Sequence, residues 1–218
     1  MKEIDLLFSL PKTKRNIEHR SFEKSSDVIS ISREFGEIYF DGPREFGYGG
    51  YKYDGRWRGV ARSLIEEYGL SAGMRVLDVG CAKGFLVKDL MIECPKLECF
   101  GIDISDYAIR NCEAEVIGRL QVGTAERLPY PDKHFDFVYS INTIHNLDRD
   151  GAKNALSEIQ RVSKGKAYVV VDSFRTAMEK LTFEKWVLTA KFYGYPRDWL
   201  KLFGESGYKG DYSWTIIT

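Results

Sequence analysis

The sequence predicts an α/β fold: a doubly wound, mostly parallel sheet with helices on both faces. Two observations support this prediction. From Met74 onward, short β-branched runs alternate with stretches of helical periodicity, as they do when helices connect parallel strands. The chain also has 218 residues, 44% of them hydrophobic, which is enough to bury the core of one domain. We therefore expect one α/β domain whose parallel strands are joined by right-handed crossovers.

Five strands are expected along this region, at residues 75–80, 97–103, 119–125, 135–141 and 166–174. Ser105 is well placed to cap the helix after the second strand. Residues 176–206 are interpreted as an inserted pair of helices, the second beginning at Pro196, because proline favours the first helical turn. The short tail that follows is enough for a single last strand. Residues 56–69 are expected to form an amphipathic helix, with an apolar face of Trp57, Ala61, Leu64, Ile65 and Tyr68.

The overall composition disfavours some partners. Lys plus Arg and Asp plus Glu are equal at 32 each, so no net charge attracts the chain to nucleic acids or anionic membranes. The N-terminal apolar run is broken at Pro11 and is far shorter than the roughly 20 apolar residues of a membrane span, so we expect a soluble, cytoplasmic protein. Cys81, Cys94, Cys99 and Cys112 lack the spacing of zinc ligands, so we expect reduced thiols and predict no metal.

The first and second strands each end in a carboxylate. Asp78 precedes a tight turn in which Gly80, Ala82 and Gly84 let the backbone approach a ligand, and the following helix offers free N–H groups. Asp103, at the end of the second strand, can accept both hydroxyls of a ribose. The turn lacks the glycine spacing of dinucleotide-binding loops, which makes NAD the weaker alternative. The pattern therefore indicates a ligand that contains adenosine.

In this order and spacing, the segments "VLDVGCAKGFL", "GIDIS" and "GTAERLPYPDKHFDFVYSINTIHNL" resemble class I, Rossmann-like methyltransferases that use S-adenosylmethionine. The resemblance covers residues 70–175 and implies an enzyme with S-adenosyl-L-methionine as its cofactor. The sheet of that family usually has seven strands. Because the tail here is too short for the usual closing hairpin, we expect one strand to be missing or supplied differently.

The resemblance also implies which residues hold the cofactor: Asp78, Gly80, Cys81, Ala82, Gly84, Asp103, Ile104, Thr124, Ala125, Glu126 and Asn142. The loop backbone would hold the methionine part, Asp103 would hold the ribose, and Ile104 would pack on the adenine. Asn142 would lie under the sulfonium end. Thr124 stands where relatives often carry an Asp for the adenine amino group, so that contact is expected to pass to Glu126 or to the main chain.

Methyl transfer requires groups that position the acceptor and, for a hydroxyl or an amine, one that removes a proton. His145 follows the fourth strand, and histidine accepts a proton near neutral pH, so His145 is the candidate catalytic general base. The alternative is a histidine that only packs or hydrogen-bonds. Asn146, beside it, is expected to line the acceptor site.

The tyrosine-rich stretch "YGGYKYDGRW" is expected to close the site as a lid. Tyr48, Tyr51 and Tyr53 would line the acceptor pocket and exclude water. Arg56 would pair with the carboxylate of the cofactor through a bidentate contact. The alternative is a Tyr-rich loop that packs on the surface.

A closer resemblance extends to "YFDGPREFGYGGYKYDGRW", "INTIHNL" and "GYKGDYS", which are similar to a subgroup of small bacterial methyltransferases associated with surface-polysaccharide and nucleotide-sugar pathways. It implies O-methylation of a small polar acceptor: a sugar, a sugar nucleotide or a polysaccharide precursor. Two alternatives stay open, a non-catalytic S-adenosylmethionine-binding regulatory protein and a methyltransferase acting on another small metabolite or on nucleic acid. Residues 1–55 are interpreted as an N-terminal extension that includes the lid, and residues 56–218 as the S-adenosylmethionine-binding methyltransferase domain.

Overall fold

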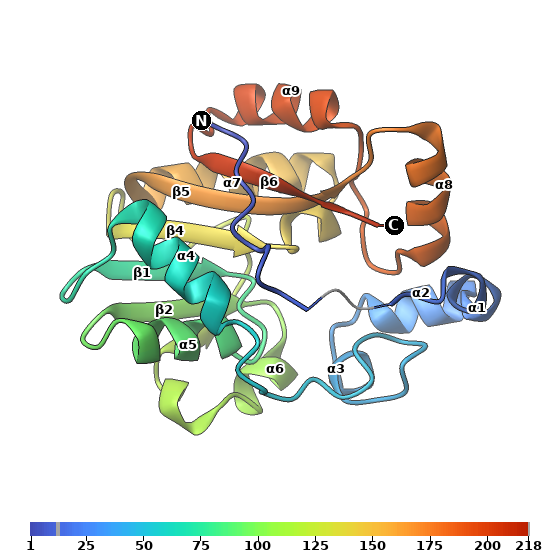
Figure 1. Cartoon of the computed structure of the whole chain (residues 1–218), viewed down its shortest axis with the longest axis horizontal. Helices are drawn as coiled ribbons and strands as arrows, with labels where there is room; N and C mark the ends of the chain where they lie inside the picture. The colour runs from blue at the N-terminus through green and yellow to red at the C-terminus, as the bar shows by residue number, and fades with distance from the viewer. Residues whose placement is uncertain (12–13, 218) are drawn as a thin grey trace.

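The central sheet is parallel throughout (Figure 1). In the computed structural model, which describes residues 1–11 and 14–217, its strand order is β3-β2-β1-β4-β5-β6. The strands are β1 (Arg75–Val79), β2 (Glu98–Asp103), β3 (Leu120–Val122), β4 (Phe135–Ile141), β5 (Ser163–Ser173) and β6 (Asp211–Ile216). The chain order reverses between β1 and β4. In open α/β sheets, ligands bind at such a reversal, beyond the carboxyl ends of the strands.

Helices cover both faces of the sheet. One face carries α4 (Arg58–Tyr68) and α5 (Phe85–Glu93), and the other carries α7 (Arg149–Val162) and α9 (Pro196–Ser206). Neighbouring strand residues serve different faces, because side chains alternate along a strand. Val76 packs under α4 and α5, whereas Leu77 packs under α7 and α9. The predicted doubly wound α/β fold is therefore confirmed.

Most of the predicted elements lie where the sequence pattern indicated. The expected helix over 56–69 is α4, and its residues Ala61, Leu64 and Tyr68 are buried. Ser105 caps α6 (Asp106–Arg110), since its hydroxyl accepts a hydrogen bond from the amide of Ala108. The inserted helices are α8 (Ala177–Trp186) and α9, which begins at Pro196. The third strand is shorter than predicted, because the sequence after Val122 turns into a loop.

The N-terminal segment of the chain pairs with the outer edge of the last strand, β6. On its other side, β6 runs parallel to β5. The amide of Ile4 donates to the carbonyl of Tyr212 at 2.9 Å, and the amide of Tyr212 donates to the carbonyl of Lys2 at 3.1 Å. The described sheet thus has one strand fewer than the usual seven, as the short tail predicted.

The N-terminal segment contains short helices that the sequence pattern did not predict. They are α1 (Ile17–Glu23), α2 (Ser26–Ser32) and α3 (Glu37–Phe40), with 3-10 turns η1 (Ala114–Val116) and η2 (Ile144–Asn146) later in the chain. Figure 1 shows the three helices grouped beside α6 and α8. The division of the chain at residue 55 stays a prediction, and residues 12, 13 and 218 lie outside the described part. Among the described helices, none is long and apolar enough to span a membrane.

Candidate active site

A cavity of about 670 Å³ lies at the carboxyl ends of β1, β2 and β4, where the strand order reverses. Its volume falls in the range of small-molecule sites. Of the residues predicted to form the site, the following line it: Tyr48, Tyr51, Arg56, Asp78, Gly80, Cys81, Ala82, Asp103, Ile104, Thr124, Ala125, Glu126, Asn142 and Asn146. Gly84, Tyr53 and His145 lie outside its wall. The cavity therefore brings together most of the residues that the sequence motifs indicated.

The loop after β1 has a backbone that few residues can adopt. Gly80, Ala82 and Gly84 all have positive φ angles, of 89°, 49° and 75°. A Cβ atom at Gly80 would lie 2.0 Å from the hydroxyl oxygen of Thr143, so glycine is required there on two grounds. Ala82 carries a Cβ in the left-handed region, and its amide donates a 2.7 Å hydrogen bond to Asp103 that holds this conformation. The loop is thus locked to the end of β2.

Two carboxyl groups flank this loop: Asp78 is buried, and Asp103 is half-buried. Asp103 accepts hydrogen bonds from the amides of Ala82 and Ser105, at 2.7 and 2.8 Å. Burial raises its pKa, and those donors oppose the rise. Burial also raises the pKa of Asp78 to about 8, with a further contribution from the negative charge of Asp103. At neutral pH Asp78 is therefore mostly protonated. It must release its proton before it can form an ion pair with a cationic group of a ligand.

The raised pKa of Asp78 predicts that the contribution of this carboxyl group to the stability of the ligand-free protein falls as the pH rises from about 4 to about 8. Below pH 4 the carboxyl is protonated in both the folded and the unfolded chain, and its contribution to the free energy of unfolding is fully present. This contribution is lost as the pH rises through the folded-state pKa. The loss is about 1.4 kcal/mol per pH unit. Asp78→Asn should reduce this slope, as measured by urea unfolding at successive pH values. Equal slopes in both proteins would contradict the prediction.

His145 is buried beside the cavity and is not part of its wall. Its ring is buried, Nδ1 accepts a hydrogen bond from the amide of Asp172 at 3.1 Å, and Nε2 lies 3.3 Å from the Asp172 carboxylate. Burial lowers the pKa of His145, although the charge of Asp172 opposes this. Because both ring nitrogens are engaged outside the cavity, the geometry argues against proton abstraction by His145. It favours the alternative, a hydrogen-bonding role that ties η2 to β5.

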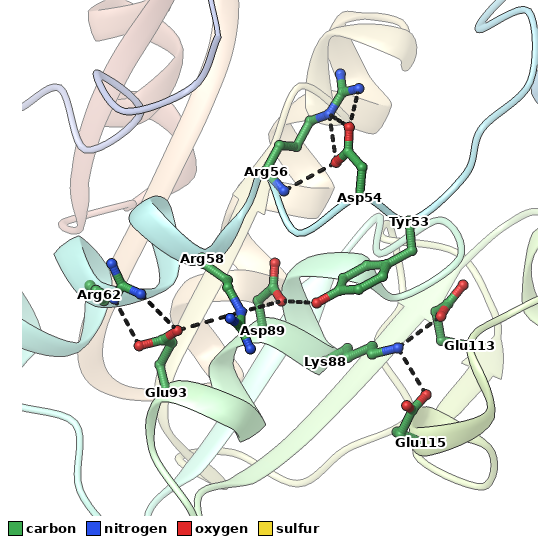
Figure 2. Close-up of polar contacts among 10 residues, drawn as sticks. All are labelled: Tyr53, Asp54, Arg56, Arg58, Arg62, Lys88, Asp89, Glu93, Glu113 and Glu115. Atoms are coloured by element: carbon green, nitrogen blue, oxygen red, sulfur yellow. Dashed lines mark hydrogen bonds and ion pairs between the residues drawn. The ribbon is translucent and has the colours of Figure 1, made fainter.

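Tyr53 also differs from its predicted role. Its hydroxyl donates a 2.6 Å hydrogen bond to Asp89 of α5, and Figure 2 shows the ring lying over the side chain of Lys88. The Nζ of Lys88 is 4.1 Å from the ring centroid. The second carboxylate oxygen of Asp89 is buried and has no hydrogen-bond partner among the described residues. Tyr53 therefore fastens the tyrosine-rich stretch to α5 and does not line the cavity.

Tyr53→Phe is expected to lower the free energy of unfolding by about 1–3 kcal/mol, because the buried Asp89 then loses the hydrogen bond that the hydroxyl donates. Tyr107→Phe is the matched control. Its hydroxyl donates to Asp41, which keeps two other donors, so a smaller loss is expected. Urea unfolding of both variants measures the difference. A Tyr53→Phe protein as stable as the parent would show that the contact contributes nothing.

Arg56 lines the cavity but already has a partner. Its guanidinium makes hydrogen bonds of 2.6–2.9 Å to the carboxylate of Asp54, and both side chains are about half exposed (Figure 2). The predicted contact with the carboxylate of the cofactor would have to displace Asp54. Sequence reasoning missed this pairing, although an Asp two positions before an Arg in a turn is a simple local signal.

An aromatic wall closes the cavity beside the β1 loop, where Lys83 of that loop donates a 3.1 Å hydrogen bond to the carbonyl of Tyr51. The rings of Tyr48 and Tyr51 lie 4.2 Å apart between centroids, and Tyr51 stacks on Phe85 at 4.5 Å. Asp41 holds this wall in place by accepting hydrogen bonds from the amide of Tyr51 and from Lys83, the latter at 2.6 Å. Lys83 is buried and paired. No local pattern links residues so far apart in the chain.

The residues around the cavity fit an adenosine-containing sulfonium cofactor. The side-chain oxygen of Asn146 is buried on the wall and has no hydrogen-bond partner in the described part of the chain. Buried polar atoms are normally paired, so this oxygen is available to a ligand. The strained loop on β1 and the carboxylate on β2 supply the remaining features of a nucleotide site. Fold and site together define a Rossmann-like, nucleotide-binding α/β domain.

Comparison with known proteins narrows this class. Residues 77–171 match the family model described as a methyltransferase domain. A sterol 24-C-methyltransferase of Gibberella zeae is 27% identical over 178 residues, which are 72% of this chain and 45% of that protein. A ubiquinone/menaquinone biosynthesis C-methyltransferase of Cupriavidus necator is 29% identical over 54% of this chain and 50% of its own length. The chain thus spans about half the length of these relatives. The matches support a class I S-adenosylmethionine-dependent methyltransferase.

Solved structures agree in fold. A methyltransferase from Archaeoglobus fulgidus, described as dependent on S-adenosylmethionine, superposes with a TM-score of 0.55 at 24% identity, over 79% of this chain and 72% of its own. A phosphoethanolamine N-methyltransferase of Haemonchus contortus, solved with phosphomonomethylethanolamine and S-adenosylhomocysteine, gives a TM-score of 0.57 at 16% identity, over 81% of this chain and 44% of its own. At these identities the likeness concerns the fold.

Proposed function

We propose that this chain transfers the methyl group of S-adenosylmethionine to a small polar acceptor. The observation that carries the proposal is the loop after β1, which is locked to Asp103 at the edge of a cavity. A loop of this kind offers main-chain groups and a ribose-binding carboxylate at one place. The sulfonium of the bound cofactor would supply a methyl carbon that is activated toward displacement.

The proposed cofactor half of the cavity consists of Asp78, Gly80, Cys81, Ala82, Asp103, Ile104, Thr124, Ala125, Glu126 and Asn142. In it, Asp103 would accept the ribose hydroxyls, and Ile104, which is 60% exposed, would pack on the adenine. Gly84 would act from outside the wall by allowing the turn into α5. In the proposed acceptor half, Tyr48 and Tyr51 exclude water and Asn146 offers an unpaired buried oxygen to orient the acceptor.

For the acceptor, we propose an oxygen atom of a sugar, a sugar nucleotide or a related polysaccharide precursor. This finer proposal rests on the resemblance of the tyrosine-rich and "INTIHNL" segments to enzymes of such pathways. The relatives described above are named for sterols, quinones and phosphoethanolamine. Their names support methyl transfer to a small molecule and do not favour a sugar over other polar acceptors.

The test is to incubate the protein with S-adenosylmethionine carrying a labelled methyl group and with pools of nucleotide sugars and polar metabolites. Mass spectrometry would then identify any species that gains the label. We expect a labelled acceptor with the parent protein and none with Asp103→Ala. Bound cofactor without transfer to any pool would instead support the non-catalytic binding protein. A labelled acceptor outside the sugar pools would overturn the finer proposal and leave methyl transfer intact.

A further inference from the structure

Positive side chains gather on the part of the cavity wall that adjoins η2. Arg15, Arg33 and Lys191 line it there. The amide of Lys191 donates to the carbonyl of His145 at 2.9 Å, which places Lys191 next to η2 and Asn146. Arg33 is adjacent, because its guanidinium donates to the carbonyl of Ala190 at 3.1 Å. These cations therefore lie on the β4 and β5 side of the cavity, in the half that we propose for the acceptor.

Among the described residues, no carboxylate lies within the 4.0 Å ion-pair distance of Arg15, Arg33 or Lys191. A counter-charge for Arg15 is the buried Asp172, where the positive charge of Arg15 opposes the rise in pKa that burial causes. Of the carboxylates that line the cavity, Asp78, Asp103 and Glu126 belong to the cofactor half, and Glu34 is on the N-terminal segment with Arg33. Two other cations at the cavity are paired: Arg56 of its wall is paired with Asp54, and Lys83 of the adjoining loop is paired with Asp41. The chain has a formal net charge of +0, so an overall excess of basic residues does not explain these unpaired cations on the cavity wall.

The positive region continues behind this wall. A second cavity of about 400 Å³ shares Arg33 and Lys191 with the first and adds Lys24 and Glu184, which leaves three cations to one carboxylate in its lining. On the same side, the guanidinium carbons of Arg15, Arg20 and Arg44 lie 5.7, 5.1 and 5.6 Å from the ring centroid of Trp186. Burial lowers the pKa of Arg20, and the charge of Arg44 contributes. The region therefore combines space for an extended ligand with a positive potential.

We propose that the acceptor carries an anionic group, a phosphate or a carboxylate, that binds to Arg33 and Lys191 with support from Arg15. This inference rests on the proposed function and specifies its substrate class. Guanidinium groups bind the oxygens of phosphates and carboxylates through paired hydrogen bonds, and an ammonium adds a compact charge. Binding the anion on this part of the wall orients the rest of the acceptor toward Asn146 and the cofactor half. Neutral, sterol-like acceptors would leave the cations unpaired.

Inorganic pyrophosphate is the probe for this site. Calorimetric titration at constant ionic strength, with the protein saturated with S-adenosylhomocysteine, should show saturable binding. We expect the double variant Arg33→Gln/Lys191→Gln to weaken it at least 10-fold and to change the affinity for S-adenosylhomocysteine less than twofold. The matched control is Arg110→Gln/Lys201→Gln, which removes the same charge from exposed positions outside both cavities. A parallel titration with malonate distinguishes the two anions: tighter pyrophosphate binding indicates a phosphate-bearing acceptor, and tighter malonate binding a carboxylate.

The outcomes separate this inference from the proposed function. If S-adenosylhomocysteine binds but neither anion does, or if the double variant behaves like the control, the anion site is overturned and methyl transfer is unaffected. If S-adenosylhomocysteine fails to bind the parent protein, the proposed function is overturned. The pyrophosphate titration on that same protein then still decides whether Arg33 and Lys191 form an anion site.

Discussion

Asp103→Ala is expected to weaken the binding of S-adenosylhomocysteine by about 100-fold or more. The carboxylate would accept both ribose hydroxyls, and hydrogen bonds to a charged group contribute about 1.5–3 kcal/mol each. A 100-fold change corresponds to about 2.7 kcal/mol. The substitution also removes the acceptor that holds the amide of Ala82, so the loop after β1 loses its anchor to β2. Equilibrium dialysis with labelled S-adenosylhomocysteine measures the affinity directly.

Two further variants separate these contributions. Asp103→Asn retains the shape and one acceptor oxygen but loses the charge, so it should fall between the parent and the alanine variant. Asp106→Ala removes an exposed carboxylate from α6 that does not line the cavity, and its affinity should match that of the parent. Parent-like affinity in Asp103→Ala would show that the cofactor does not use the end of β2.

Gly80→Ala is expected to lower the free energy of unfolding by about 3 kcal/mol or more and to remove cofactor binding. The new methyl group would meet Thr143 at 2.0 Å from its hydroxyl oxygen and 2.3 Å from its methyl carbon, at a backbone φ of +89°. Overpacking costs about 1–3 kcal/mol, and a strained backbone costs a similar amount. Urea unfolding and ligand binding would both register the change.

Gly204→Ala is the matched control for this substitution. Gly204 lies within α9, its added methyl group would have no neighbour within 4 Å, and its φ is not positive. Alanine there should leave stability unchanged or raise it slightly, because alanine favours helix. If Gly80→Ala were tolerated as well as Gly204→Ala, the loop after β1 would be less constrained than the geometry indicates.

The sheet and the cofactor half could be predicted because their signals are local. Alternating β-branched and helical runs marked the strands, and Asp78, Gly80 and Asp103 each lie at or next to the end of a strand that is evident in the sequence. Parallel strands bring their carboxyl ends to one edge, so residues at several strand ends met in one cavity. The family resemblance added the nature of the ligand.

In the acceptor half, the sequence predicts Tyr48, Tyr51 and Asn146 as lining residues, but the cations Arg33 and Lys191 could not be predicted, because their positions depend on contacts between distant segments. Helices α1, α2 and α3 span at most 7 residues, too few for a clear periodic signal. Arg33 meets the carbonyl of Ala190 across 157 positions, and His145 meets Asp172 across 27. Tyr53 is two positions after Tyr51, so in an extended segment both side chains would lie on the same face. Tyr53 instead faces α5, because its hydroxyl donates a hydrogen bond to the buried Asp89. Such pairings follow from the tertiary fold and leave no local pattern.

The central claim, that this cavity is the site of S-adenosylmethionine, is tested most directly by isothermal titration calorimetry of the parent protein with S-adenosylhomocysteine. We predict saturable binding of one ligand per chain. Because the pKa of Asp78 is about 8 in the ligand-free protein, a cationic ligand group that binds beside Asp78 would also release a proton near pH 7. Heats that never saturate, or a site that Asp103→Ala and Gly80→Ala leave unchanged, would contradict it.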